Sequence, residues 1–134
     1  MATPIVFTSR SVLNLDSLKS SPGYFYVMSP YSKHPAGLEI AFQQACEATG
    51  WLMERGVKAF SPIAHSHALS LQAGIDPLSH AFWMPVDRPL MEAAVGGIVA
   101  QLPGWNESFG VAAELAYFRE AGKPVHHLPW PIHL

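Results

Sequence analysis

Glu114 is a carboxylate set among glycine and alanine residues in a segment, 108–125, that has the pattern of a helix followed by a strand. Small neighbours such as Gly110 let a ligand approach the backbone closely. A carboxylate held against a ligand can stabilise a developing positive charge or attack it as a nucleophile. The competing interpretation is a solvated surface residue, because charged side chains are mostly exposed. We take Glu114 as the first candidate catalytic residue.

Asp87 is the second candidate catalytic residue. A carboxyl group can hold a ligand or protonate a leaving group, so Asp87 is considered beside Glu114. The alternative is a helix-capping or surface role before Pro89. Tyr26 and Tyr31 could form hydrogen bonds to the same ligand, although core packing is the stronger interpretation for Tyr26.

His65 and His67 form an H-x-H pair, which can supply two metal ligands on one side of an extended segment. Zinc needs three or four ligands, and neither a cysteine nor a further histidine pair lies at a familiar spacing. We therefore predict no metal and no cofactor, and we expect these histidines to bind substrate or to shape a loop. Trp105, beside Gly104, could stack on a ligand or fill a subunit contact.

Short apolar runs alternate with helical patterns along the chain. The predicted strands are 24–28, 57–60, 97–102 and 125–128, and the predicted helices are 38–56, 76–94 and 108–122. Asp76 should cap the second of these helices, with Pro77 at its first position, and Pro85 and Pro89 should bend or break it. The polar segment 61–74 is expected to be a functional loop.

This alternation predicts an α/β fold: a single-domain, doubly wound, Rossmann- or flavodoxin-like parallel sheet of about four to five strands, with helices on both faces. Ligands bind such sheets beyond the carboxyl ends of the strands. Three groups of residues are expected to meet in one crevice there: Met28, Ser29, Pro30 and Tyr31; the segment that carries His65 and His67; and residues 105–108, from Trp105 to Ser108.

The composition limits the class of protein further. With 134 residues the chain forms one domain, which we place at 24–134 behind an N-terminal extension, 1–23, in which residues 5–7 could add an edge strand. Eight Lys and Arg against ten Asp and Glu leave no basic patch, which argues against a nucleic-acid polymer as partner. Cys46, the one cysteine, excludes an internal disulfide and is expected to be a small core residue.

Hydropathy bears on location and assembly. No segment approaches the roughly 20 apolar residues that span a bilayer. The chain also does not open with the pattern of a signal peptide, so we expect no membrane partner and a cytoplasmic protein. Apolar residues make up 49% of the chain, which predicts apolar surface buried against other subunits of a homo-oligomer.

The pattern G-x-x-x-E-L-A-x-x-x-x-x-G-K-P-V, which runs from Gly110 to Val125, resembles the C-terminal signature of the nucleoside 2-deoxyribosyltransferase superfamily. YVMSPY at 26–31 and the position of Asp87 extend the resemblance over roughly residues 24–128. The motifs F-S-P-I-A-H-S-H, W-x-x-x-D and L-P-G-W-x-x-S-x-G-x-x-x-E are similar to those of a branch known only as a domain of unknown function.

The resemblance implies an activity and a role for each matching residue. The superfamily's glutamate attacks the anomeric carbon of a deoxyribose and displaces the base, which casts Glu114 as the nucleophile and Asp87 as a residue that positions the nucleoside. The implied reaction is cleavage or transfer of the N-glycosidic bond of a 2′-deoxynucleoside or its 5′-monophosphate. A serine six residues before the glutamate marks the branch that holds a 5′-phosphate, and Ser108 stands there.

The implied partner is a small-molecule nucleoside or nucleotide, and relatives complete their sites across a subunit boundary. The expected substrate-binding residues are Tyr26, Ser29, Pro30, Tyr31, His65, His67, Trp105, Ser108 and Gly110. The alternative function is a non-catalytic module of the same fold that binds a nucleotide or a nucleotide derivative.

Overall fold

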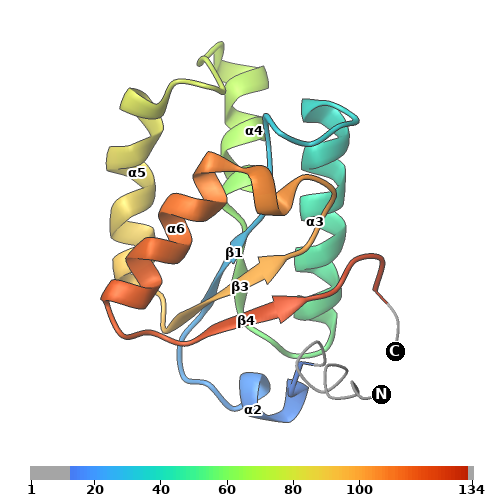
Figure 1. Ribbon diagram of the computed structural model, residues 1–134, viewed down its shortest axis with the longest axis vertical. Helices are drawn as coiled ribbons and strands as arrows, with labels where there is room; N and C mark the ends of the chain where they lie inside the picture. Colours follow the sequence, from blue (N-terminus) through green and yellow to red (C-terminus); the bar gives the residue numbers. More distant parts are fainter. Residues whose placement is uncertain (1–12, 133–134) are drawn as a thin grey trace.

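The computed structural model describes residues 13–132. At its centre is a four-stranded sheet with all neighbouring strands parallel, in the order β2-β1-β3-β4 (Figure 1). The strands are β1 (Phe25–Met28), β2 (Ala59–Phe60), β3 (Gly96–Ala100) and β4 (Val125–Leu128), and the helices are α2 (Leu15–Lys19), α3 (Leu38–Glu54), α4 (Pro62–Ala73), α5 (His80–Ala93) and α6 (Phe109–Glu120), with a short 3₁₀ helix, η1 (Trp105–Glu107). The predicted Rossmann-like α/β fold is confirmed.

Side chains alternate along the strands and enter two separate cores. Phe25 and Val27 of β1 pack in a cluster with residues of α2 and α3, whereas Tyr26 and Met28 pack in a cluster with residues of α5 and α6. Both faces of the sheet are therefore buried, which explains why the strands read as continuous apolar runs. One consequence bears on the site: Tyr26 faces α6, the helix that carries Glu114.

The helix predicted around Glu114 is confirmed as α6. Ser108 caps it, because its side-chain oxygen accepts a hydrogen bond from the N–H of Val111 at 3.2 Å. Gly122 follows the helix with a φ of +70°, a conformation that other residues rarely adopt. The chain then enters β4 within a few residues.

The prediction of a loop at 61–74 is wrong, because this segment folds into the helix α4. Ser61 caps this helix by accepting the N–H of Ala64 at 3.1 Å, Pro62 takes the first helical position, and Gly74 ends the helix with a φ of +70°. Ser61 and Gly74 are capping signals that predict a helix, whereas the polar composition of the segment favours a loop.

Helix α5 begins later than predicted and is not broken. Ser79, rather than Asp76, caps it by accepting the N–H of Phe82 at 3.3 Å. The helix continues through Pro85 and Pro89, both of which are exposed. Carbonyl groups that lose their helical N–H partner on an exposed side can bond to water instead, which reduces the cost of each proline.

The remaining expectations about the chain have mixed outcomes. Cys46 is exposed on α3, so the prediction of a small core residue is wrong. Residues 5–7, which could add an edge strand or pack on a neighbour, lie outside the described residues. Within residues 13–132, no helix combines the length and the apolar character that a membrane crossing requires.

Candidate active site

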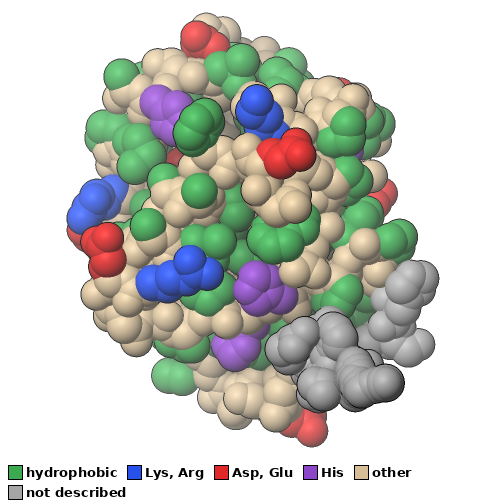
Figure 2. Space-filling view, viewed as in Figure 1, with side chains coloured by type: hydrophobic (Ala, Val, Ile, Leu, Met, Phe, Trp, Pro, Cys, Tyr) green, Lys and Arg blue, Asp and Glu red, His purple; other side chains and the backbone are tan. Residues whose placement is uncertain are grey.

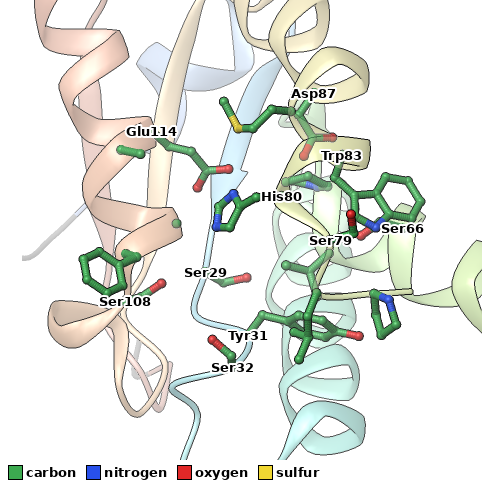
Figure 3. A pocket seen from close by; sticks show the side chains of 18 of the residues that line it. Ser29, Tyr31, Ser32, Ser66, Ser79, His80, Trp83, Asp87, Ser108 and Glu114 are labelled. Carbon is green, nitrogen blue, oxygen red and sulfur yellow. The ribbon is translucent and has the colours of Figure 1, made fainter. Parts of the chain in front are cut away.

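A cavity of about 380 Å³ opens beyond the carboxyl ends of β1 and β3. Strand β1 lies between β2 and β3, so the connections that leave β1 and β2 run to opposite sides of the sheet. Doubly wound folds bind ligands at this switch in strand order. The cavity is lined by the segments that follow these two strands and by α4, α5 and α6. Figure 3 shows Glu114 and Asp87 projecting into this space from α6 and α5.

Glu114 is held at the cavity wall by a strand of the core. The Tyr26 hydroxyl donates a hydrogen bond to Oε2 of Glu114 at 3.0 Å. Burial, followed by the charge of Glu114, raises the pKa of Tyr26, so this hydroxyl keeps its proton and acts as a donor. Burial also raises the pKa of Glu114 to about 8, a rise that the Tyr26 hydrogen bond opposes and the charge of Asp87 increases.

Asp87 approaches the same space from α5. Its Oδ1 atom is buried and has no hydrogen-bond partner among residues 13–132. Burial raises the pKa of Asp87 to about 6, and the nearby His65 opposes this rise. A buried carboxyl oxygen without a partner is costly unless a ligand satisfies it, which marks Asp87 as a group available for binding.

Burial raises the pKa of both carboxyl groups, and the charge of Asp87 raises that of Glu114 further. With pKa values of about 6 and about 8, Asp87 is the group that is ionised near neutral pH, and Glu114 is the group that holds a proton. One carboxylate and one carboxyl group therefore line the same cavity. Such a combination can both accept a proton from a ligand and donate one to it.

Asp87→Asn should lower the pKa of Glu114, because it removes a charge that opposes ionisation of the glutamate. A pH titration of the labelled Glu114 side-chain carboxyl carbon by NMR would measure the change. Asp76→Asn is the matched control, since Asp76 is exposed and does not line the cavity. An unchanged titration of Glu114 in the Asp87 variant would show that the two groups do not interact.

Four of the predicted substrate-binding residues line the cavity: Ser29, Tyr31, Ser108 and Gly110. The hydroxyl oxygen of Ser29 is buried and has no partner within the described residues, so it is free to bind a ligand. Tyr26 lies behind Glu114 and reaches the cavity only through that side chain.

Pro30, His65, His67 and Trp105 do not line the cavity. Because α4 is helical, His65 and His67 point in different directions: His65 is exposed and His67 is buried. Trp105 packs edge-on to His127 at 5.9 Å between ring centres. Among residues 13–132, no three His, Cys, Asp or Glu side chains lie close enough to share a metal ion.

Several polar and aromatic cavity residues were not predicted from the sequence. They include Ser66, Ser79, His80, Trp83 and Tyr117. A capping signal at Ser79 and a helical assignment for α4, which carries Ser66, would have suggested two of them. Trp83 is fixed at the wall because its indole N–H donates to the carbonyl of Asp76 at 3.0 Å.

The model of one protein family, described as a domain of unknown function (DUF1937), matches residues 23–129. The chain belongs to this family. The DUF1937 region takes in all four strands and every residue that lines the cavity, including Asp87 and Glu114. None of the curated proteins matches the chain.

Proposed function

We propose that this DUF1937 protein cleaves or transfers the N-glycosidic bond of a 2′-deoxynucleoside or its 5′-monophosphate, with Glu114 as the nucleophile. The observation that carries the proposal is the Glu114 carboxyl group, which is held by Tyr26 and lines the same cavity as Asp87. The signature around Glu114 adds support, because it resembles that of the nucleoside 2-deoxyribosyltransferase superfamily.

The reaction requires a carboxylate beside a developing cation. As the bond between the anomeric carbon and the base nitrogen breaks, the sugar becomes oxocarbenium-like, and Glu114 captures it as a covalent glycosyl ester. The electron pair of the broken bond stays on the base nitrogen, which takes a proton from Asp87. The positive charge on the sugar favours the ionised form of Glu114, so Glu114 loses its proton as the transition state forms, and Asp87 has to gain one before it protonates the base.

One feature favours a second candidate, a non-catalytic module that binds a nucleotide or nucleotide derivative. With a pKa raised to about 8, Glu114 keeps its proton at neutral pH and can donate a hydrogen bond to a ligand. Such a module would bind nucleotides without breaking them.

Incubation with a panel of deoxynucleosides and deoxynucleotides, followed by chromatography for free base, distinguishes the two candidates. The enzyme should release base from at least one 2′-deoxy compound. Compounds that raise the melting temperature without any release of base would favour the binding module instead.

We further propose that the substrate carries a 5′-phosphate, held near Ser108. This residue lies at the N-terminus of α6, where backbone N–H groups and the helix dipole favour an anion, and it lines the cavity. Glu107, next to it, is exposed, which leaves its charge in solvent. Monophosphates should therefore bind roughly ten- to a hundredfold more tightly than the matching nucleosides, as expected for a hydrogen bond to a charged group.

Ser108→Ala should remove most of that difference, measured by calorimetry with a nucleoside and its monophosphate. Ser61→Ala is the matched control, because Ser61 caps α4 in the same way but does not line the cavity. Both variants lose a helix cap, worth about 1 kcal/mol, yet only the Ser108 variant should lose the preference for phosphate. Equal affinity for nucleoside and monophosphate in the unmodified protein would refute this assignment.

We also propose that the protein forms a homo-oligomer through the apolar rim of the cavity. Phe109 is 79% exposed and Leu78 is 53% exposed, and both line the cavity. Figure 2 shows further apolar side chains between sparse charges on the face that carries α5 and α6.

Light scattering at micromolar concentration should give a mass above that of one chain. Phe109→Asp should lower this mass, whereas Leu71→Asp on α4 should not, because Leu71 is exposed but does not line the cavity. A monomeric mass for the unmodified protein would contradict the proposal.

A further inference from the structure

One wall of the cavity is a single stripe of residues along α6. Gly110, Ala113, Glu114 and Tyr117 follow one another at helical spacing, and all four line the cavity. Tyr117 therefore lies about one turn beyond Glu114, on the side away from the start of the helix. Figure 3 shows Ser108 at the start of α6, Glu114 further along this helix and Asp87 on the opposite wall.

The end of the cavity away from the start of α6 is formed by Tyr117 together with Arg88 and Met91 of α5. The guanidinium carbon of Arg88 lies 5.6 Å from the centre of the Tyr117 ring, so these two side chains meet across the space between the helices. Lys123, just after α6, donates hydrogen bonds to the carbonyl groups of Met91 at 3.0 Å and Glu92 at 2.7 Å. It also donates to the Tyr117 hydroxyl at 3.4 Å, which fixes that hydroxyl beside the C-terminus of α5.

The side chains at this end offer hydrogen-bond donors. The Lys123 ammonium can only donate, so the Tyr117 oxygen accepts from it and keeps its own hydrogen for another partner. Arg88 donates its Nε hydrogen to Glu92 at 3.3 Å and retains the hydrogens of its two terminal nitrogens. The carbonyl groups of Met91 and Glu92 already accept from Lys123. A ligand that reaches this end therefore needs an acceptor there.

The proposed function directs the base of the nucleotide toward this end. The 5′-phosphate and the base are attached on opposite sides of the ring oxygen of the sugar. With the phosphate at Ser108 and the anomeric carbon at Glu114, the base therefore continues toward Tyr117. Asp87, the neighbour of Arg88 in the chain, protonates the base in the proposed mechanism, so it also meets the base as a donor. The edge of the base farthest from the sugar then lies against Arg88 and Tyr117.

We propose that Arg88 and Tyr117 recognise an oxo group of the base, at position 6 of a purine or position 4 of a pyrimidine. This inference rests on the proposed function and deepens it, because it names the class of base. A carbonyl oxygen has two lone pairs and can accept from both side chains. An amino group at the same position would set its own N–H groups against these donors. Arg88 and Tyr117 are thus specificity-determining residues.

Matched pairs of deoxynucleoside monophosphates provide the experiment. Deoxyinosine and deoxyadenosine monophosphates differ at position 6, and deoxyuridine and deoxycytidine monophosphates differ at position 4, with the oxo group in the first member of each pair. Chromatography of the free base released at several substrate concentrations gives kcat/KM for each compound. The oxo member should exceed the amino member by roughly ten- to a hundredfold, because the amino group leaves buried donors without a partner.

Variants distinguish recognition of the base from a structural role. Arg88→Met keeps the apolar stem of the side chain and Tyr117→Phe keeps the ring, but each removes donors. Each should lower kcat/KM for the oxo member and change the amino member little, so the preference should shrink roughly five- to tenfold. Structural damage would lower kcat/KM for both members alike. Arg119→Met is the matched control, since Arg119 is exposed near the end of α6 and does not line the cavity, and it should keep the preference.

Equal kcat/KM within both pairs in the unmodified protein would overturn the inference and leave the proposed function in place. An unchanged preference in both Arg88→Met and Tyr117→Phe would do the same. If no compound loses its base, the proposed function is refuted, and calorimetry with the same pairs decides the inference. The oxo members should then still bind more tightly, with a preference that is lost in Arg88→Met, whereas equal affinities within both pairs would overturn the inference as well.

Discussion

Glu114→Gln should reduce the rate at which free base is released at least about a thousandfold, because an amide can neither capture nor neutralise the cationic sugar. The amide nearly matches the carboxyl group in size and can still accept the hydrogen bond from Tyr26. Folding and affinity for a deoxynucleoside monophosphate should therefore change little, as judged by circular dichroism and calorimetry.

Asp76→Asn offers a control for the loss of one carboxylate without any change in the cavity, because Asp76 is exposed and does not line it. It should keep the full rate. If Glu114→Gln also kept most of its activity, the glutamate could not be the nucleophile.

The same substitution should raise stability at high pH. The pKa of Glu114 is raised from 4.5 to about 8 in the folded protein, so the folded state holds its proton more tightly than the unfolded state does. Stability is therefore lost as the pH rises from about 4.5 to about 8, and the loss is complete above that range. Glu114→Gln removes this loss and should increase the free energy of unfolding by roughly 2 to 4 kcal/mol at about pH 9.

Urea unfolding of both proteins at about pH 4 and about pH 9 would measure this effect, with a small difference expected at the lower pH. Glu120→Gln is the control on the same helix, and because Glu120 is exposed it should change stability by less than about 0.5 kcal/mol at either pH. Equal stability of Glu114→Gln and the unmodified protein at about pH 9 would show that the Glu114 carboxylate is not desolvated.

Local pattern was sufficient to predict most of the fold. Signals carried within a few residues predict these elements. They are the apolar runs that form β1, β3 and β4 and the capped, periodic segment that forms α6. The polar composition of α4 favours a loop and conflicts with the helix-capping signals at Ser61 and Gly74, so composition alone predicts the wrong structure there. The exposure of Cys46 depends on which face of α3 packs on the sheet. Cys46 lies beside apolar positions of this helix in the sequence, and that is not enough to tell whether it points toward the sheet or toward solvent.

The site was predictable in its parts but not in its contacts. The small residues around Glu114 were enough to make it a candidate site residue. Its hydrogen bond to Tyr26, however, joins residues 88 positions apart and exists only because β1 packs against α6. The contact between Arg88 and Tyr117 could not be predicted for the same reason, since it needs α5 and α6 to lie along the same cavity. Unpartnered buried oxygens, such as that of Asp87, are properties of the folded chain alone.

A covalent glycosyl ester on Glu114 is the most direct consequence of the proposed mechanism. The protein would be mixed with a deoxynucleoside monophosphate, quenched in acid within the time of one turnover, digested and analysed by mass spectrometry. The mechanism predicts a peptide containing Glu114 that is heavier by one deoxyribosyl phosphate group, and no such peptide from Glu114→Gln. Two results would contradict the mechanism, provided that the unmodified protein releases free base. One is an adduct on a residue other than Glu114, and the other is full activity in Glu114→Gln.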